Sequence, residues 1–340
     1  MDIVVPPGLD GVIVAETAIS EIDAAGGHLR YRGRDVEEVV ERFRFEELVE
    51  WLAEPERLLE LGRDPDSGPM GVLMETLVAE GEGLDVGEPG AVPRYLVRVA
   101  ERFAERLGPG WTGPLPDGVG LAGRYLAHLR GTAPSLEEAR ALDAYWVMAA
   151  EHSLNASTFA VRIAASTGAR LPLALAAGVA VLSGPLHGGA PTGVLDLLDE
   201  AALYRQDLPG LVAAKLEAGE RIMGFGHRVY RAEDPRARAL RARFRVLARS
   251  HERVALASEL EAAVLTALSA RHPERVLATN VEFYAAVVLD ALGIPRAWCP
   301  PTFAVGRMAG WTAHYVEQRA EGRLIRPLAR YRPRPSAPSA

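Results

Sequence analysis

The chain has 340 residues, enough for two domains or one large one, and its composition of 49% hydrophobic and 24% charged residues is typical of a globular protein. A formal net charge of −7 argues against a general nucleic-acid binder, which carries a basic face, and the single cysteine, Cys299, excludes an intrachain disulfide or a cysteine-rich metal site. With neither a signal-peptide pattern nor an apolar run long enough to span a bilayer, we expect a cytoplasmic protein with no membrane partner.

Two short strands are predicted near the N-terminus, at Val12–Ala15 and Leu29–Tyr31, around the turn at 25–27. From Asp35, which can cap a helix, apolar residues recur at helical spacing. Further helical segments are predicted at 72–78 and 94–107, separated by loops rich in glycine and proline.

Helical periodicity dominates the remaining chain. Ser135 and Glu138 have the spacing of a capping box, which predicts a helix beginning at residue 136. From Arg330 onward, arginine, proline and serine predict an extended arm. The class is therefore all-α with a small N-terminal β element. The predicted helices are 136–151, 156–168, 172–183, 193–203, 208–222, 234–249, 253–271, 279–292 and 302–320.

The segment 223–236 places His227 between two glycines and a cluster of arginines that includes Arg231 and Arg236. Glycine lets the backbone approach a ligand, and an imidazole beside cations tends to stay neutral near pH 7. Because guanidinium groups match carboxylates and phosphates, the pattern favours a pocket for a small anionic substrate. The alternative is a glycine-rich turn before an arginine-rich helix, with His227 on the surface.

Other candidate residues are spread along the chain: His152, His187, Glu282, Arg307 and Arg326. Each alone has a structural explanation, such as a hydrogen-bonded histidine or an internal ion pair. The histidines and Glu282 are residue types that can bind a metal ion. However, the sequence has no His-x-His or His-Glu-x-x-His pair, which is typical of such sites, and we predict no metal. Dinucleotide and phosphate-loop fingerprints are also absent, so no cofactor is predicted.

Eight motifs in a fixed order carry more information than any one of them. The chain resembles the citrate synthase family in its bacterial and archaeal short form, over nearly its whole length and most specifically from 152 to 327. The motifs are Glu-Thr-Ala-Ile-Ser (16–20), Leu-Arg-Tyr-Arg-Gly (29–33), His-Ser-Leu-Asn-Ala-Ser-Thr (152–158), Gly-Pro-Leu-His-Gly-Gly-Ala (184–190), Met-Gly-Phe-Gly-His-Arg-Val-Tyr (223–230), Asp-Pro-Arg (234–236), Phe-Ala-Val-Gly-Arg (303–307) and Arg-Leu-Ile-Arg-Pro (323–327).

The resemblance implies a role for each matching residue. His187 is similar to the histidine that hydrogen-bonds the thioester oxygen of acetyl-CoA, and His227 to the one that polarises the ketone of oxaloacetate. Arg231 lies where the family has a basic residue near the CoA phosphates. The positions that match the clamp for the oxaloacetate carboxylates are His152, Arg236, Arg307 and Arg326.

The resemblance also implies a two-domain helical fold and a homodimer. A large domain would comprise 1–190 and 297–340, and a small mobile domain 191–296, with Arg326 completing the site of the partner subunit. The implied reaction joins acetyl-CoA to oxaloacetate and hydrolyses citryl-CoA to citrate and CoA, as in the tricarboxylic acid cycle. Its enolate step needs a base and a hydrogen-bond donor, and its dianionic electrophile explains the arginines.

One departure from the family pattern affects the base itself. The family has aspartate where this chain has Glu282, in the segment Asn-Val-Glu-Phe-Tyr-Ala-Ala. Glutamate keeps the carboxylate but adds a methylene, and a misplacement of about 1 Å can cost on the order of 100-fold in rate. Two alternatives therefore stand beside a citrate synthase: a 2-methylcitrate synthase using propionyl-CoA, and a non-catalytic carboxylate- or CoA-binding paralogue.

Overall fold

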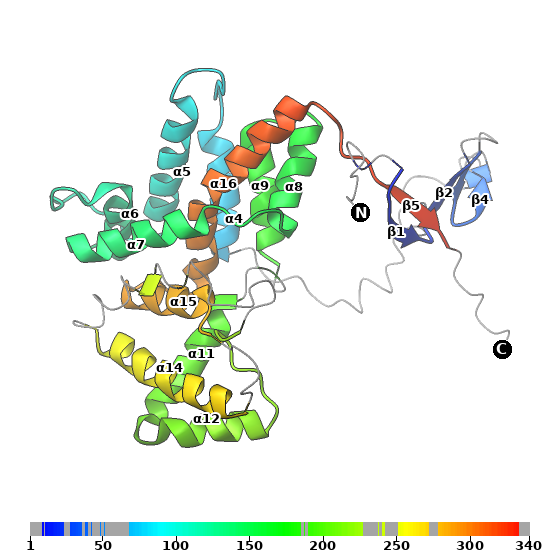
Figure 1. Cartoon of the computed structure of the whole chain (residues 1–340). Coiled ribbons are helices and arrows are strands. Elements are labelled where there is room, and N and C mark those ends of the chain that lie inside the picture. The colour runs from blue at the N-terminus through cyan, green and yellow to red at the C-terminus, as the bar shows by residue number, and fades with distance from the viewer. Residues whose placement is uncertain are drawn as a thin grey trace. The chain divides into compact units, whose positions relative to one another are not determined.

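The computed structural model divides the chain into two compact units (Figure 1). Unit 1 consists of Met1–Asp66 with Gly322–Ala340, and unit 2 of Ser67–Glu321. The residues that the structure describes are 11–23, 28–35, 68–184, 190–226, 251–271 and 278–332, with residues 9, 38, 39, 42, 48, 51, 187, 237, 240 and 241.

Among the described residues, the strands lie in unit 1 and form two small sheets. In one, β1 (Ile13–Thr17) pairs in parallel with β5 (Leu328–Tyr331), which joins the two ends of the chain. In the other, β2 (Ser20–Asp23), β3 (His28–Tyr31) and β4 (Arg34–Asp35) run antiparallel in that order.

The N-terminal predictions were partly right. The two predicted strands are confirmed as β1 and β3, whereas β2, β4 and β5 were not predicted, although residues from Arg330 were expected to be extended. Asp35 lies in β4, where its carboxylate accepts a hydrogen bond from Nε of Arg30 over 3.1 Å. Its predicted role as a helix cap involves residues 36 and 37, which lie outside the described residues, and stays a prediction. The predicted all-α class with a small β element is confirmed.

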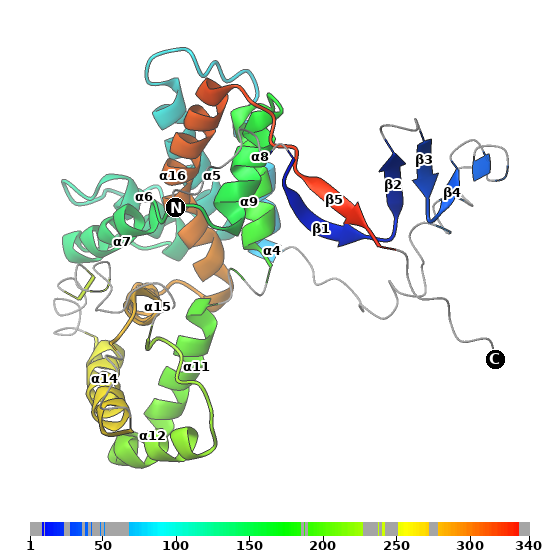
Figure 2. The same cartoon turned by 45° about the vertical axis from the view of Figure 1, so that its right-hand side comes forward.

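Unit 2 is built mainly of helices, and those between 68 and 182 surround the longest one (Figures 1 and 2). They are α4 (Gly68–Glu80), α5 (Ala91–Leu107), α6 (Gly120–Arg130), α7 (Leu136–Ala149), α8 (Ala156–Ser166) and α9 (Leu171–Leu182), packed around α16 (Cys299–Glu321).

Four further helices gather at the other end of unit 2: α11 (Ala190–Leu203), α12 (Leu208–Glu217), α14 (Glu252–Arg271) and α15 (Val281–Ala291) (Figures 1 and 2). Two 3-10 turns, η2 (Arg205–Asp207) and η3 (Arg296–Trp298), lie in the connections. These helices fall within the predicted small domain 191–296 and its immediate borders. The division into a large domain and a mobile small one stays a prediction.

Buried aromatic residues join α5, α6, α7 and α16. The ring of Tyr125 lies 6.4 Å from that of Phe103 and meets Trp146 edge-on at 5.1 Å. Trp146 donates its indole N–H to the carbonyl oxygen of Thr302 over 2.9 Å, and the hydroxyl groups of Tyr125 and Thr302 are hydrogen-bonded to each other. Because the polar ends of these rings are satisfied inside the core, α7 is fixed in register against the start of α16.

Most of the predicted helices are present with boundaries shifted by a few residues. Ser135 forms the predicted capping box, since its hydroxyl accepts from Glu138 N–H and the Glu138 carboxylate accepts from Ser135 N–H. α6 was not predicted, although its buried positions recur at helical spacing. The helix predicted at 234–249 lies outside the described residues except for 237, 240 and 241, which are helical.

Candidate active site

His187 lies between α9 and α11 and is hydrogen-bonded to the N-terminal turn of α8. Its Nε2 atom is 2.9 Å from Oγ of Ser157, whose hydroxyl donates to Oδ1 of Asn155 over 2.8 Å. Asn155 is the N-cap of α8 and also accepts the backbone N–H of Thr158. The cap that starts the helix therefore also orders the hydroxyl facing the imidazole.

This chain of hydrogen bonds couples the tautomer of His187 to the direction in which the Ser157 hydroxyl donates. A neutral imidazole has one N–H, and a serine hydroxyl has one hydrogen to donate. While Ser157 donates to Asn155, Nε2 of His187 is the donor toward Ser157. When the hydroxyl turns onto Nε2 instead, the ring proton belongs on Nδ1, the nitrogen on the far side from Ser157.

The surroundings of His187 also disfavour its charged form. Burial lowers the pKa of the imidazole below its usual value, and the positive charge of Arg307 lowers it further. At neutral pH the ring is therefore an uncharged hydrogen-bond donor. Such a group can stabilise a developing enolate oxygen without first giving up a proton.

Arg307 is buried on α16 and reaches the end of α7. Only 3% of the residue is exposed. Its Nε donates to the backbone carbonyl of Ala149 over 2.5 Å, and its guanidinium carbon lies 4.8 Å from the ring centre of Phe303. A guanidinium held this firmly has little freedom to lose on meeting a carboxylate, which makes it a suitable clamp for an anionic substrate.

The position of Arg307 depends on two glycines that let α16 approach α7 closely. A Cβ atom added at Gly306 would lie 2.8 Å from the Trp146 side chain, and one added at Gly310 would lie 2.0 Å from the carbonyl oxygen of Ala150. At Gly310 the neighbour is backbone and cannot rotate away. Glycine is therefore required here for the close packing of the two helices.

His152 is half-buried in the short segment between α7 and α8. The next residue, Ser153, has a φ of 55°, which is uncommon for a residue other than glycine, and its N–H donates to the carboxylate of Glu151. The other oxygen of Glu151 lies 3.3 Å from Nε2 of His314 on α16. The tight turn at Ser153 is thus anchored on both sides of His152, which links its position to α16.

Glu282 lies on the first turn of α15, and its helix is tied to the segment that leads into His227. Asn280 caps α15 by accepting the N–H groups of Glu282 and Phe283, and its amide donates to the carbonyl of Gly226 over 3.0 Å. Backbone hydrogen bonds from Gly226 to Ala278 and from Asn280 to Gly224 extend this contact. Gly226 directly precedes His227, so two predicted catalytic motifs are joined by hydrogen bonds.

These two groups of residues occur in the same compact unit, and α15 contacts α7, whose end receives Arg307. His187, Arg307 and the turn around His152 form one group, and the start of α15 with Gly224–Gly226 forms the other. His227, Arg231 and Arg236 lie outside the described residues. Arg326 is exposed and belongs to unit 1. Its predicted role stays a prediction.

Two properties of the described residues bear on other kinds of site. No group of three or more His, Cys, Asp or Glu side chains that could hold a metal ion is found among them. Within the same ranges, none of the helices is both long and apolar enough to cross a membrane.

Comparison with known proteins gives the family. The model of the citrate synthase C-terminal domain matches residues 8–59 and 96–328. The chain belongs to the citrate synthase family. A relative from Mycobacterium tuberculosis that is named as a citrate synthase is 40% identical, over 98% of this chain and 95% of that protein. A 2-methylcitrate synthase from Shewanella oneidensis is 30% identical, over 95% of this chain and 94% of its own length.

A solved structure agrees with this assignment. The citrate synthase of Thermotoga maritima superposes with a TM-score of 0.57 at 30% identity, covering 95% of this chain and 94% of that one. The predicted citrate synthase family and its helical fold are therefore confirmed.

Two polar residues of the citrate synthase motifs have roles that the sequence predictions did not assign. Ser157 holds the ring of His187, and Asn280 caps the helix of Glu282. An asparagine directly before a helical run is a signal for an N-cap, and it was available in the sequence at both Asn155 and Asn280. The contact between Ser157 and His187 spans 30 residues and has no local signal.

Proposed function

We propose that the protein condenses acetyl-CoA with oxaloacetate and hydrolyses the resulting citryl-CoA to citrate and CoA. The observation that carries this proposal is His187, which burial and Arg307 keep neutral and which Ser157 orients. A neutral imidazole with a fixed ring is suited to donate a hydrogen bond to a thioester oxygen. Membership of the citrate synthase family supports the same chemistry.

In this mechanism Glu282 acts as the base. Its carboxylate removes a proton from the methyl group of acetyl-CoA, and the negative charge moves onto the thioester oxygen. In the tautomer with the ring proton on Nδ1, Nε2 of His187 accepts the Ser157 hydroxyl, and the Nδ1–H group can stabilise the enolate oxygen. The first turn of α15 is a suitable location for Glu282, because the Asn280 cap fixes the start of that helix.

The carbon–carbon bond forms next, and the thioester is then cleaved. The methylene carbon of the enolate attacks the ketone carbon of oxaloacetate, while His227 polarises that ketone and protonates the new alkoxide. Arg307 pairs with a carboxylate of the electrophile, together with His152 and Arg236. Water then attacks the thioester of citryl-CoA and expels CoA as the thiol. Arg231 is assigned to the CoA phosphates.

Release of CoA thiol is the assay that tests this function. We expect turnover with acetyl-CoA and oxaloacetate, a collapse of turnover in Glu282→Gln, and retention of activity in Glu282→Asp. A wild type that binds oxaloacetate but releases no thiol from any acyl-CoA would identify a non-catalytic paralogue. If Glu282→Asp restored thiol release to such an inactive protein, the loss of catalytic activity would be due to residue 282 alone.

A second candidate is a 2-methylcitrate synthase, which is favoured by the similarity to the Shewanella oneidensis enzyme of that name. Propionyl-CoA differs from acetyl-CoA by one methylene, a difference that a pocket discriminates by only about 10- to 200-fold. Competition between the two acyl-CoA substrates at equal concentration measures the ratio of their kcat/KM values. A ratio in favour of propionyl-CoA would replace the first proposal by the second.

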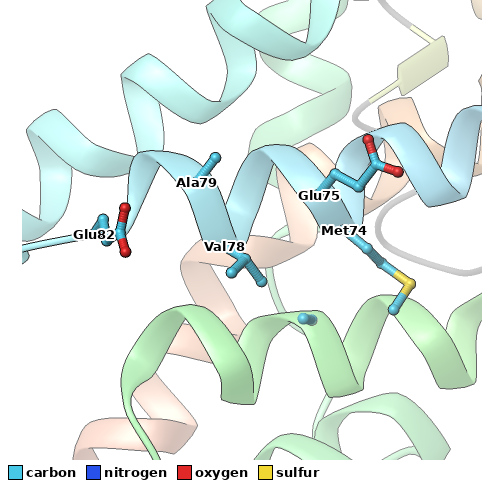
Figure 3. A pocket seen from close by; sticks show the side chains of 6 residues that line it. Met74, Glu75, Val78, Ala79 and Glu82 are labelled. Carbon is cyan, nitrogen blue, oxygen red and sulfur yellow. The ribbon is translucent and has the colours of Figure 1, made fainter.

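We further propose that the protein is a homodimer whose contact includes α4 and α9. Figure 3 shows Met74 and Val78 of α4 pointing toward the neighbouring helix, at a groove whose lining also includes Ala79, Ala176, Glu75 and Glu82. Val78 is 45% exposed, and Leu173 on α9 is 49% exposed. The exposed apolar side chains of this face fit a second copy of the chain, with Glu75 and Glu82 among the groove's lining. Light scattering should give a dimer for the wild type and a smaller mass for Val78→Glu.

The predicted exchange of Arg326 between subunits can be tested by mixing two inactive variants. Glu282→Gln and Arg326→Ala are each expected to be inactive as homodimers. If Arg326 serves the site of the partner subunit, hybrid dimers contain one intact site, and random reassociation restores about a quarter of wild-type activity. A mixture of two inactive variants without any recovery would place Arg326 in the site of its own subunit, whereas an active Arg326→Ala homodimer would place it outside the site.

A further inference from the structure

Glu261 lies on α14, a helix that carries none of the residues assigned a chemical role, and binds the segment that carries Glu282. The hydroxyl of Thr279 donates to its carboxylate oxygen Oε1 over 2.5 Å, and the hydroxyl of Tyr284 donates to the same oxygen. Both donors are almost completely buried, at 1% and 0% exposure. Two buried hydroxyls thus depend on one carboxylate for their hydrogen bonds.

Tyr284 connects this contact to a further part of the chain. Its hydroxyl accepts a hydrogen bond from Nε of Arg241 over 2.8 Å while it donates to Glu261. Burial and the hydrogen bond to Glu261 together raise the pKa of Tyr284 to about 12, so the hydroxyl keeps its proton at neutral pH. Arg241 lies five residues after the predicted substrate ligand Arg236.

The two contacts of Glu261 lie on either side of Glu282 in the sequence. Thr279 comes just before the cap residue Asn280, and Tyr284 follows Glu282 by two positions on the first turn of α15. Asn280 alone could start the helix, but one cap does not fix the direction in which the turn points. Attachment at both Thr279 and Tyr284 fixes the first turn of α15 against α14.

We propose that Glu261 is a positioning residue that places Glu282 for proton abstraction. The proposal rests on the condensation assigned to this protein under its proposed function. Glu261 touches no substrate in this account and acts through Thr279 and Tyr284. A charged acceptor is suited to this task, because hydrogen bonds to a carboxylate are roughly twice as strong as those between neutral groups.

The test compares three variants on α14. Glu261→Ala removes the acceptor and leaves a residue that favours helix, Glu261→Gln keeps an oxygen that can accept both hydroxyls, and Glu259→Ala is the matched control. Glu259 is on the same helix, where it pairs with Arg205 at the surface. Each variant is assayed for thiol release with acetyl-CoA and with its trideuterated methyl form.

For Glu261→Ala we expect kcat to fall about 10- to 100-fold, as for a reacting group displaced by a fraction of an ångström to about 1 Å. The KM values should stay close to those of the wild type, and the deuterium isotope effect on kcat should rise because proton abstraction becomes slower than the other steps. Glu261→Gln should recover most of the loss, and Glu259→Ala should behave as the wild type.

Hydrogen–deuterium exchange gives a readout that does not depend on turnover. The amides of Glu282 and Phe283, which donate to Asn280, should exchange faster in Glu261→Ala than in Glu259→Ala. A purely structural role would lower the amount of folded enzyme and leave the isotope effect unchanged. That result, with or without faster exchange, would overturn the positioning role.

The failure of this proposal can be distinguished from the failure of the proposed function. A wild type that releases no thiol from either acyl-CoA refutes the function, and the positioning role falls with it. A wild type with turnover, beside a Glu261→Ala variant with unchanged kcat and isotope effect, refutes the positioning role alone.

Discussion

Substitution of Gly310 by alanine tests how the packing of α16 on α7 supports the site. The added Cβ atom would lie 2.0 Å from the backbone oxygen of Ala150 and 2.6 Å from Oε2 of Glu151. Neighbouring carbon atoms pack at about 3.5–4.0 Å, so the two helices must separate by roughly 1 Å or more. Such overpacking costs about 1–3 kcal/mol, partly offset by the gain of about 1 kcal/mol for alanine over glycine in a helix.

The effect on activity should exceed the effect on stability. The net loss of at most about 2 kcal/mol corresponds to a fall in Tm of up to roughly 3 °C for a protein of this size. The same displacement moves Arg307 away from the carbonyl of Ala149, to which its Nε donates over 2.5 Å. A misplacement of about 1 Å in a substrate-binding group can lower the rate on the order of 100-fold.

Thermal unfolding and thiol release measure the two effects on the same samples of Gly310→Ala. The control is Ala313→Ser, which adds one heavy atom at an exposed position of the same helix. We expect the control to match the wild type in Tm and in kcat/KM for oxaloacetate. A Gly310→Ala variant with the Tm and kcat/KM of the wild type would contradict this prediction. It would show that the contact between α16 and Ala150 accommodates a methyl group, and that Gly310 does not determine the position of Arg307.

Three further predictions concern the hydrogen bonds of the site. Ser157→Ala should lower kcat by about 10-fold or more with little change in KM, because the ring of His187 loses the partner that fixes its tautomer, and steady-state kinetics measure this split. The folded-state pKa of His187 lies below its unfolded value of about 6.5, so the unfolded chain binds more protons as the pH falls. The free energy of unfolding should therefore decrease below about pH 6.5, and urea titrations should show a weaker dependence for His187→Gln; an identical slope would contradict the assignment. Asn280→Ala should cost about 1 kcal/mol through the lost helix cap and should also reduce turnover, and an unfolding curve equal to that of the wild type would show that the cap is dispensable.

Local sequence signals were sufficient for much of the helical fold. The capping box at Ser135 marks the start of α7, and the apolar rhythm of α14 gives its length to within one residue. Both depend on residues within one or two turns of each other, where spacing and chemistry determine structure. α6 was not predicted because it follows a segment rich in glycine and proline and itself contains Gly120 and Gly123, which are poor helix formers.

Long-range contacts could not be predicted in the same way. The parallel pairing of β1 with β5 joins residues more than 300 positions apart, and neither short segment indicates its partner. In the sequence, Glu261 is not distinguishable from other polar residues of an amphipathic helix. Only the structure shows that the hydroxyls of Thr279 and Tyr284 both donate to its carboxylate. The family motifs indicated His187 as a site residue, but only the structure shows that its ring is hydrogen-bonded to Ser157.

The central claim is that Glu282 takes a proton from the methyl group of the acyl-CoA. Its most direct test is the entry of solvent deuterium into the methyl group of acetyl-CoA, followed by NMR in the presence of malate, a dicarboxylate that lacks the reactive ketone. We expect exchange with the wild type and with Glu282→Asp, and none above background with Glu282→Gln. Exchange by Glu282→Gln at the wild-type rate would contradict the claim, because another group would then be the base.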